Sequence, residues 1–219
     1  GGGLDIACLG FAECDSAGNV NASRFAGRIA GCGGFINISQ NSKKVVFVGT
    51  FTSGGLKTCL ENGELKILSE GKHNKFVKEV SQVTFSGNRA GREGRSVLYV
   101  TERCVFALRE NGLELVEVAP GIDMQADILD LLPFAPLIND PMLMDSKLFS
   151  EGIMGLRETI SDIHIENRIS YFEETNTLFL DFSGMRVKTT DDIERIKSAV
   201  ESTLDRLDHR VVAIVNYDS

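Results

Sequence analysis

GRIAGCGGFINISQNSKKVVFVGTFT, residues 27–52, is the stretch of this 219-residue sequence that decides its fold. The glycine cluster from Gly31 to Gly34 precedes residues 35–41, which are predicted to form a short helix. Residues 44–52 follow and are rich in β-branched and aromatic side chains, which is typical of a buried strand. Glycines, a helix and a buried strand in this order indicate an α/β fold.

The segments on either side of this stretch are predicted to be mostly strands. Residues 4–15 are typical of one strand, or of two strands joined at Gly10, and a turn is expected at 15–19. Further strands are expected in hairpins at 56–60 with 65–68, 97–100 with 105–108, and 113–118. Two Asn-Gly pairs mark the tight turns of these hairpins. A short amphipathic helix is predicted at 122–132, where Pro133 ends it.

The carboxy-terminal third predicts a small separate unit. Residues 136–168 hold prolines and methionines and are expected to be an irregular connection with a short helix. A hairpin is predicted from 169–172 and 177–182. A helix beginning at Thr189 or Thr190 then places its apolar side chains on one face. A final strand at 211–215 completes a small α/β layer.

Composition and charge exclude several classes of function. The formal net charge is −8, from 31 acidic and 23 basic residues, which disfavours binding to nucleic acid or to an anionic membrane. An anionic small ligand remains compatible, because backbone dipoles can bind one on an acidic protein. Five cysteines without metal-ligand spacing indicate a reduced, cytoplasmic protein without a metal. No signal peptide or membrane span is evident.

The glycine cluster is the best candidate site. Gly31, Gly33 and Gly34 ahead of a helix present backbone N–H groups at the positive end of the helix dipole, which suits a phosphate or an oxyanion. The cluster is not a P-loop, because no Lys-Ser/Thr pair follows it, and it lacks the dinucleotide-binding spacing. A tight packing turn explains the same spacing equally well.

Other polar residues favour structural interpretations. Glu13 and Asp15 share a face of their strand, yet without a base or a metal they are more typical of solvated residues, as is Asp5. The adjacent Glu102 and Arg103 interrupt an apolar hairpin and indicate an internal ion pair or a turn. Cys32 stands near a helix start, where a thiol pKa can fall, but no partner base is evident for catalysis.

Several ordered motifs resemble the glutamate-dependent CoA-transferases, in particular the single-chain acetate/propionate and short-chain acyl-CoA:acetate/3-ketoacid type. The motifs are Gly1-Gly-Gly-Leu-Asp5, Asp15-Ser-Ala-Gly-Asn-Val-Asn21, Gly27-Arg-Ile-Ala-Gly-Cys-Gly-Gly-Phe-Ile36, Val45-Val-Phe-Val-Gly-Thr-Phe-Thr52, Thr84-Phe-Ser-Gly87, Tyr99-Val-Thr-Glu-Arg-Cys-Val-Phe106, Ala119-Pro-Gly-Ile-Asp123 and Val211-Val-Ala-Ile-Val-Asn-Tyr-Asp218. The resemblance is expected over essentially the whole chain.

For the fold, the resemblance implies an open three-layer α/β/α domain with a mixed sheet and β-hairpins, plus a small carboxy-terminal α/β unit. Residues 1–135 would be a β-subunit-like catalytic domain that lacks its start. Residues 136–168 would be the connection, and residues 169–219 the small unit. The enzyme is expected to be a homo-oligomer.

For the chemistry, the resemblance implies ping-pong transfer through a glutamyl-CoA thioester, which is nucleophilic catalysis by a carboxylate. Gly31, Gly33 and Gly34 would form the glycine loop of that site, with an N–H of Gly33 or Gly34 as oxyanion donor. Gly1, Gly2 and Gly3 would form a second loop lining the thioester pocket. Coenzyme A and short carboxylates would be substrates, with no tightly bound cofactor.

The nucleophilic glutamate has no matching position here. In the family it precedes the motif at Gly1–Asp5, and the sequence opens at that motif. Gly1 to Gly3 alone are also typical of a cloning remnant, but the match favours native sequence. Glu61-Asn-Gly and Glu110-Asn-Gly imitate the catalytic segment and are more typical of tight turns. The chain is therefore expected to need a missing amino-terminal part for activity. Two alternatives are a non-catalytic acyl-CoA-binding or scaffolding remnant and an acyl-CoA hydrolase.

Overall fold

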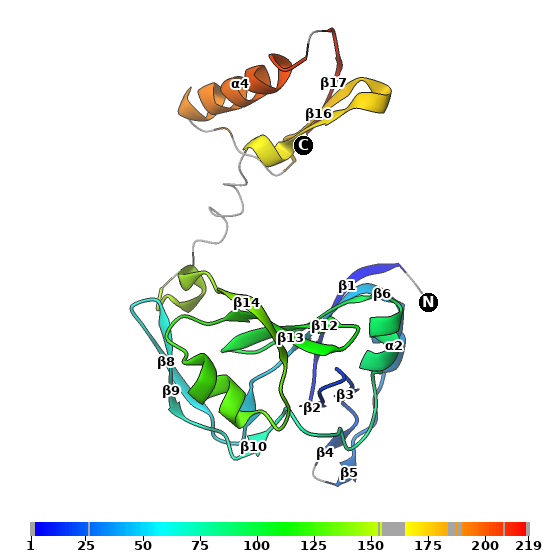
Figure 1. The fold of residues 1–219 in the computed structure, drawn as a ribbon, viewed down its shortest axis with the longest axis vertical. Helices are drawn as coiled ribbons and strands as arrows, with labels where there is room; N and C mark the ends of the chain where they lie inside the picture. The colour runs from blue at the N-terminus through cyan, green and yellow to red at the C-terminus, as the bar shows by residue number, and fades with distance from the viewer. Residues whose placement is uncertain are drawn as a thin grey trace. The chain divides into compact units, whose positions relative to one another are not determined.

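The structure, a computed structural model, describes residues 3–25, 27–152, 154, 165–183, 187, 190–207 and 209–217. The chain divides into two compact units, Gly1–Met154 (unit 1) and Gly155–Ser219 (unit 2). Figure 1 shows the elements of each unit along the chain.

Unit 1 is organised around a six-stranded mixed sheet in the order β1–β6–β11–β12–β13–β14. Its strands are β1 (Leu4–Gly10), β6 (Ser42–Val48), β11 (Ser96–Val100), β12 (Cys104–Arg109), β13 (Gly112–Val118) and β14 (Leu137–Leu143). The β1–β6, β6–β11 and β13–β14 pairs are parallel, and β11–β12 and β12–β13 are antiparallel. The mixed sheet confirms the predicted α/β class, and β1 ends at Gly10 as expected.

Four two-stranded antiparallel pairs lie outside this sheet. They are formed by β2 (Glu13–Cys14) with β3 (Val20–Asn21), β4 (Arg24–Phe25) with β5 (Arg28–Ile29), β7 (Thr52–Ser53) with β10 (His73–Asn74), and β8 (Lys57–Glu61) with β9 (Glu64–Ser69). The β8–β9 hairpin turns at Asn62 and Gly63, both with positive φ, as the Asn-Gly pair predicts. Figure 1 shows the β4–β5 hairpin extending away from the sheet.

The helices of unit 1 are short. They are α1 (Phe35–Asn41), α2 (Gly87–Arg92), the π-helix η1 (Met124–Ile128) and the 3₁₀ turns η2 (Leu129–Leu131) and η3 (Ser146–Phe149). The helix predicted at 35–41 is confirmed. The amphipathic segment predicted at 122–132 is helical, but it consists of a π turn followed by a 3₁₀ turn.

The main core cluster of unit 1 lies on one face of the sheet and is rich in aromatic rings. The Phe47 ring lies 5.0 Å from the Phe85 ring, 5.3 Å from the Tyr99 ring and 5.8 Å from the Phe35 ring, measured between centroids. Because Phe35 opens α1, these contacts fix that helix against β6. A smaller cluster on the opposite face of the sheet gathers Leu65, Val105, Ala119, Met144 and Phe149.

Unit 2 has the strand–strand–helix–strand order that the sequence predicts. Its elements are η4 (Ile165–Arg168), β15 (Ile169–Phe172), η5 (Glu173–Thr175), β16 (Thr177–Asp181), α4 (Thr190–Leu204) and β17 (Val212–Asn216). β15 and β16 pair antiparallel, and β16 and β17 pair parallel. Thr189, one of the two expected start residues of the helix, lies outside the described residues.

One expectation about the region 136–168 is wrong. Residues 137–143 are not irregular, because they form β14 at the edge of the main sheet. The strand departs from regular geometry at Asp140, where φ is 50°, and its register against β13 shifts near that point. An edge strand tolerates this interruption and Pro141, because one side needs no ladder hydrogen bonds. The predicted boundaries at 135 and 168 stay predictions, and the division into compact units follows Met154.

Candidate functional site

The glycine loop leads from the β4–β5 hairpin into α1. Gly31 and Gly33 have positive φ values of 80° and 49°, which favour glycine, whereas Gly34 has φ of −83°. A Cβ atom at Gly31 or Gly33 would meet nothing within 4 Å. Within the described part of the chain, the N–H groups of Gly33 and Gly34 have no acceptor. The Phe35 N–H donates to the Cys32 carbonyl at 2.9 Å, so residues 32–35 form a tight turn with Gly33 and Gly34 exposed at its centre. The loop therefore fits a turn as well as it fits an anion site.

A buried asparagine holds the base of this loop. Asn21 is fully buried, and its Oδ1 accepts hydrogen bonds from the backbone N–H groups of Ser23 and Arg24, each at 3.0 Å. Its Nδ2 donates to Glu13 Oε2 at 2.9 Å and to the Arg24 carbonyl at 2.7 Å. The Ala30 N–H then donates to the Ser23 carbonyl at 2.8 Å, which closes the base of the segment.

Glu13 is part of this base and is not a free carboxylate. Its Oε2 accepts 2.8 Å hydrogen bonds from both the backbone N–H and the hydroxyl of Ser81. Partial burial acts to raise the pKa of Glu13, but the hydrogen bonds from Ser81 and Asn21 outweigh it and lower that pKa. The carboxylate therefore stays ionised and links β2 to the segment before α2.

The other acidic candidates have structural partners of their own. Asp15 is buried, and its Oδ1 accepts from the N–H groups of Ala17 and Asn19 in the turn after β2. Asp5 forms an exposed ion pair with Lys43 at 2.7 Å. Glu13 and Asp15 thus bind different groups and do not form one site.

Cys32 and Gly3, two further candidates from the sequence, have few contacts that suggest a function. Cys32 is half-buried and packs against the main core cluster. Gly3 is exposed, with φ of 98° and no atom within 4 Å of a Cβ built on it. Gly1 and Gly2, the remainder of the predicted second glycine loop, lie outside the described residues.

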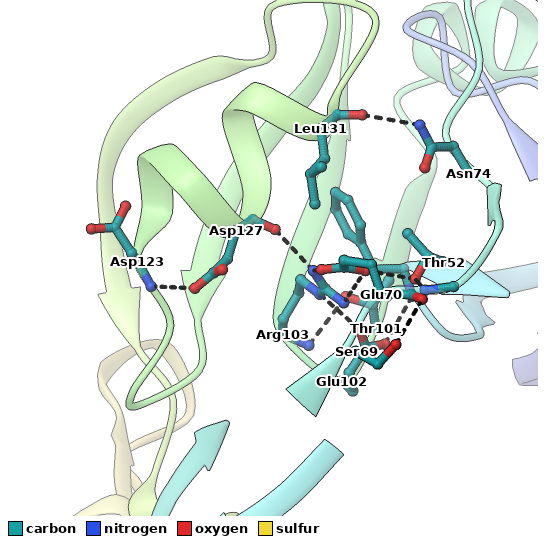
Figure 2. Close-up of polar contacts among 12 residues, drawn as sticks. Thr52, Ser69, Glu70, Asn74, Thr101, Glu102, Arg103, Asp123, Asp127 and Leu131 are labelled. Carbon is teal, nitrogen blue, oxygen red and sulfur yellow. Dashed lines mark hydrogen bonds and ion pairs between the residues drawn. The ribbon is translucent and has the colours of Figure 1, made fainter. Parts of the chain in front are cut away.

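Arg103 is the centre of a second polar network, shown in Figure 2. Its side chain is completely buried. Nε donates to Glu102 Oε1 at 2.7 Å, and the two terminal nitrogens donate to Glu70 at 2.6 and 3.2 Å. Nη1 also donates to the Asp127 carbonyl in η1 at 3.0 Å. The guanidinium lies over the Phe51 ring, 4.7 Å from its centroid. The predicted internal ion pair of Glu102 and Arg103 is confirmed.

The two carboxylates of this network, on Glu102 and Glu70, also accept hydrogen bonds from residues 51 and 52. Glu102 Oε2 accepts from the Phe51 N–H at 2.8 Å, and Glu70 Oε2 accepts from the Thr52 hydroxyl at 2.8 Å. Partial burial acts to raise the pKa of Glu70, but its bonds to Arg103 and Thr52 lower it overall. The network joins four segments of the chain, at 51–52, 70, 102–103 and 127, and its polar groups bind one another, which makes it structural.

The two Glu-Asn-Gly segments are hairpin turns. Glu61 ends β8 and forms an exposed ion pair with Lys66 across the hairpin. Glu110 is exposed between β12 and β13. Neither carboxylate lies at the glycine loop, and the prediction that both segments are tight turns is confirmed. Among the described residues, no group of three or more His, Cys, Asp or Glu side chains is suited to hold a metal ion.

Sequence reasoning missed three residues that shape these sites. Glu70 and Ser81 carry no local signal, because their partners lie far along the chain: Ser81 and Asn21 are 60 positions apart. Asn21 binds nearby backbone as well, through the N–H groups of Ser23 and Arg24. Asn21 does stand in a stretch matching a family motif, which was the only sign of its importance.

The chain is similar to several known proteins. No family model matches the chain. Over 156 residues the chain is 51% identical to acetate CoA-transferase YdiF of Escherichia coli K12, which covers 71% of this chain and 29% of YdiF. Over 162 residues it is 50% identical to caffeate CoA-transferase of Acetobacterium woodii, which covers 71% of this chain and 31% of that protein. The crystal structure of the YdiF acyl-CoA transferase apoenzyme from E. coli O157:H7 matches with a TM-score of 0.68 at 51% identity, over 70% of this chain and 30% of that one.

These similarities confirm the resemblance to CoA-transferases and correct its extent. The matches cover 71% of the chain, whereas essentially all of it was expected to match. Unit 2 is too short to hold a match of 156 residues, so most of the matched residues lie in unit 1. The matched segment spans about a third of the length of these relatives.

Proposed function

We propose that this chain, homologous to a segment of CoA-transferases over 71% of its length, is the carboxy-terminal part of an enzyme that moves CoA between a short-chain acyl-CoA and a carboxylate. The carboxylate would be acetate or a 3-keto acid. The observation that carries this proposal is the 51% identity to acetate CoA-transferase YdiF. The second relative is named for caffeate, so the acyl group varies among proteins of this similarity.

The proposed reaction runs through the carboxylate of a glutamate. That carboxylate attacks the thioester carbonyl, and the CoA thiolate leaves to give a mixed acyl-glutamyl anhydride. The thiolate then attacks the glutamyl carbonyl, which releases the first acid and forms a glutamyl-CoA thioester. The second acid repeats these steps in reverse and departs as the new acyl-CoA. The solved YdiF acyl-CoA transferase includes a thioester complex with CoA, which supports this route.

The glycine loop has the features that such a reaction needs from this chain. Each attack on a carbonyl develops an oxyanion, which preorganised N–H donors stabilise. The N–H groups of Gly33 and Gly34 have no acceptor among the described residues, and the backbone of Gly31 and Gly33 is unobstructed. In this proposal one of the two N–H groups is the oxyanion donor, and Gly1 to Gly3 line the thioester pocket.

The nucleophile would come from outside this chain. Glu61 and Glu110 are turn residues with no link to the glycine loop. The amino-terminal part of the same longer protein would supply the glutamate, and this chain alone would be inactive. The complete enzyme would be a cytoplasmic homo-oligomer that uses CoA as a substrate and needs no tightly bound cofactor. No helix in the described residues is long and apolar enough to cross a membrane.

Gly34→Ala in the complete protein tests this function. The backbone of Gly34 suits alanine, and the new methyl would meet only the Ile38 side chain, at an ordinary 3.4 Å. We expect acyl-CoA:acetate transfer to fall about tenfold or more, because the methyl crowds the oxyanion donor. The denaturation midpoint should not change. Gly33→Ala should also slow transfer, but its φ of 49° adds about 1 kcal/mol of backbone strain.

The controls are Glu61→Ala and Glu110→Ala, which should leave transfer intact. A Gly34→Ala protein with full transfer activity would show that the loop is not the oxyanion site. Consumption of acyl-CoA by the complete protein without dependence on acetate would favour a hydrolase. Binding of acyl-CoA without turnover would favour a non-catalytic remnant.

A further inference from the structure

One face of the sheet is left open over β1 and β6. Side chains alternate along these strands, so Ala7, Leu9 and Phe47 face the aromatic core, and the residues between them face the opposite way. On that opposite face Leu4 is 46% exposed, Ile6 56% and Val48 48%, and Cys8 is also exposed. Lys44 lies on the same face, opposite Ile6, and is exposed too. We call these five residues the β1–β6 face.

On the next strand, β11, the same side of the sheet is covered by packed side chains. Leu98 and Val100 of β11 lie beside β6 in register, with Val100 opposite Val48. Both pack against the cluster that includes Phe149 and Leu65. The covering layer therefore stops at β11, and the two neighbouring strands beyond it carry exposed apolar side chains.

Exposed apolar residues are unusual on parallel strands. Parallel sheets are buried on both faces, because the helices that connect their strands cover them. Here β1 pairs parallel with β6, and α1, which connects them, packs with Phe35 on the Phe47 side. The β1–β6 face thus lacks the layer that parallel pairing requires. In addition, β1 is the edge strand of the sheet.

We propose that the β1–β6 face is the docking surface for the amino-terminal part of the same longer protein, which covers its apolar side chains. This inference rests on the proposed function. The occupant follows from length: the curated relatives extend over about three times the segment that this chain matches. A matched relative therefore has ample chain to supply the absent layer.

Cysteine labelling tests the surface without any substitution. Cys8 lies on the β1–β6 face, whereas Cys59 lies in β8 and is half-buried. Cys14 and Cys104 are buried, and burial raises the pKa of Cys14 well above 9 and that of Cys104 to about 12, so both should be unreactive while the core is intact. We expect a maleimide to label Cys8 in the 219-residue chain and at least tenfold more slowly in the complete protein. The Cys59 rate should stay the same.

Ile6→Asp and Leu68→Asp give a matched pair of variants of the complete protein. Leu68 is 64% exposed on β9 and outside the β1–β6 face. We expect Ile6→Asp to restore Cys8 labelling to within about threefold of its rate in the chain alone, because a docked layer would have to bury the new carboxylate together with Lys44, which lies opposite residue 6, and removing both charges from water opposes docking. Leu68→Asp should leave Cys8 protected. Continued protection of Cys14 and Cys104 shows that the core remains folded; if Ile6→Asp exposes them, Ile6→Thr takes its place.

Two outcomes would overturn the inference. Equal labelling of Cys8 in the chain and in the complete protein would show that nothing docks on this face. Protection of Cys8 already in the 219-residue chain would assign the face to another part of this chain or to a second copy. Failure of the proposed function can be told apart from failure of the docking proposal. If the complete protein protects Cys8 but transfers no CoA, the docking surface stands and the proposed reaction is wrong.

Discussion

Arg103→Met is expected to lower the free energy of unfolding of unit 1 by about 3 kcal/mol, because it removes the cation from a buried ion-pair network. Glu102 and Glu70 would remain without their partner. Both carboxylates are partly exposed and can regain water, which keeps the expected loss at the lower end of the range for broken buried pairs. Urea denaturation followed by circular dichroism measures the change.

Arg89→Met is the matched control for this prediction. Arg89 pairs with Glu93 one turn along α2, and both side chains are exposed. Pairs of this kind contribute about 0.3–0.5 kcal/mol, so the midpoint should barely move. If Arg103→Met were as stable as Arg89→Met, the network of Figure 2 would not hold unit 1 together.

The same network gives the effect of Arg103→Met a pH dependence. The pKa of Glu70 is lowered in the folded protein, so the stability that its ionised form contributes is complete above the ordinary pKa of 4.5. It is lost as the pH falls through the folded pKa, because the unfolded state then binds more protons. The difference in stability between wild type and Arg103→Met should therefore shrink in acid. A difference that stays constant from pH 7 to pH 3 would contradict this assignment.

Gly87→Ala is expected to destabilise unit 1 by about 3 kcal/mol through a clash with backbone atoms. A Cβ at this position would lie 2.1 Å from the Ala17 carbonyl oxygen and 2.4 Å from the Gly18 carbonyl carbon. The Gly87 N–H also donates to Asn19 Oδ1 at 3.0 Å, so the start of α2 cannot move away without losing that bond. Thermal denaturation measures the effect.

Gly152→Ala is the control for this glycine. A Cβ at Gly152 would meet nothing within 4 Å, and its backbone does not have positive φ. The melting temperature of this variant should match wild type within error. A Gly87→Ala protein that also melts like wild type would show that the 15–19 turn is free to shift away from α2.

Local sequence signals predicted the parts of the fold that depend on neighbouring residues. The Asn-Gly pair at 62–63 fixes a two-residue turn by itself, and the β8–β9 hairpin follows. The helix at 35–41 and the alternation of buried residues in β6 also follow from short stretches of sequence. The ordered motifs indicated a similarity to CoA-transferases, and the comparisons confirm that similarity.

Features that depend on distant residues were not predictable in this way. Glu70 and Arg103 meet across 33 positions, and Asn21 and Ser81 across 60, so spacing gives no sign of either contact. β14 was missed because Asn139, Asp140 and Pro141 interrupt an otherwise apolar stretch of sequence. In the structure Asp140 has positive φ at this interruption. Only its position at the sheet edge makes that sequence compatible with a strand.

The mixed sheet also has a consequence for the order in which the protein folds. β11, β12 and β13 follow one another in hairpins, so their pairing closes only short loops. The parallel pairing of β6 with β11 must instead close a loop that contains the β8–β9 hairpin, which is slower. We expect amides of β12 to gain protection from hydrogen exchange before those of β1 during refolding. β1 would then join the sheet after the β11–β12–β13 hairpins have formed.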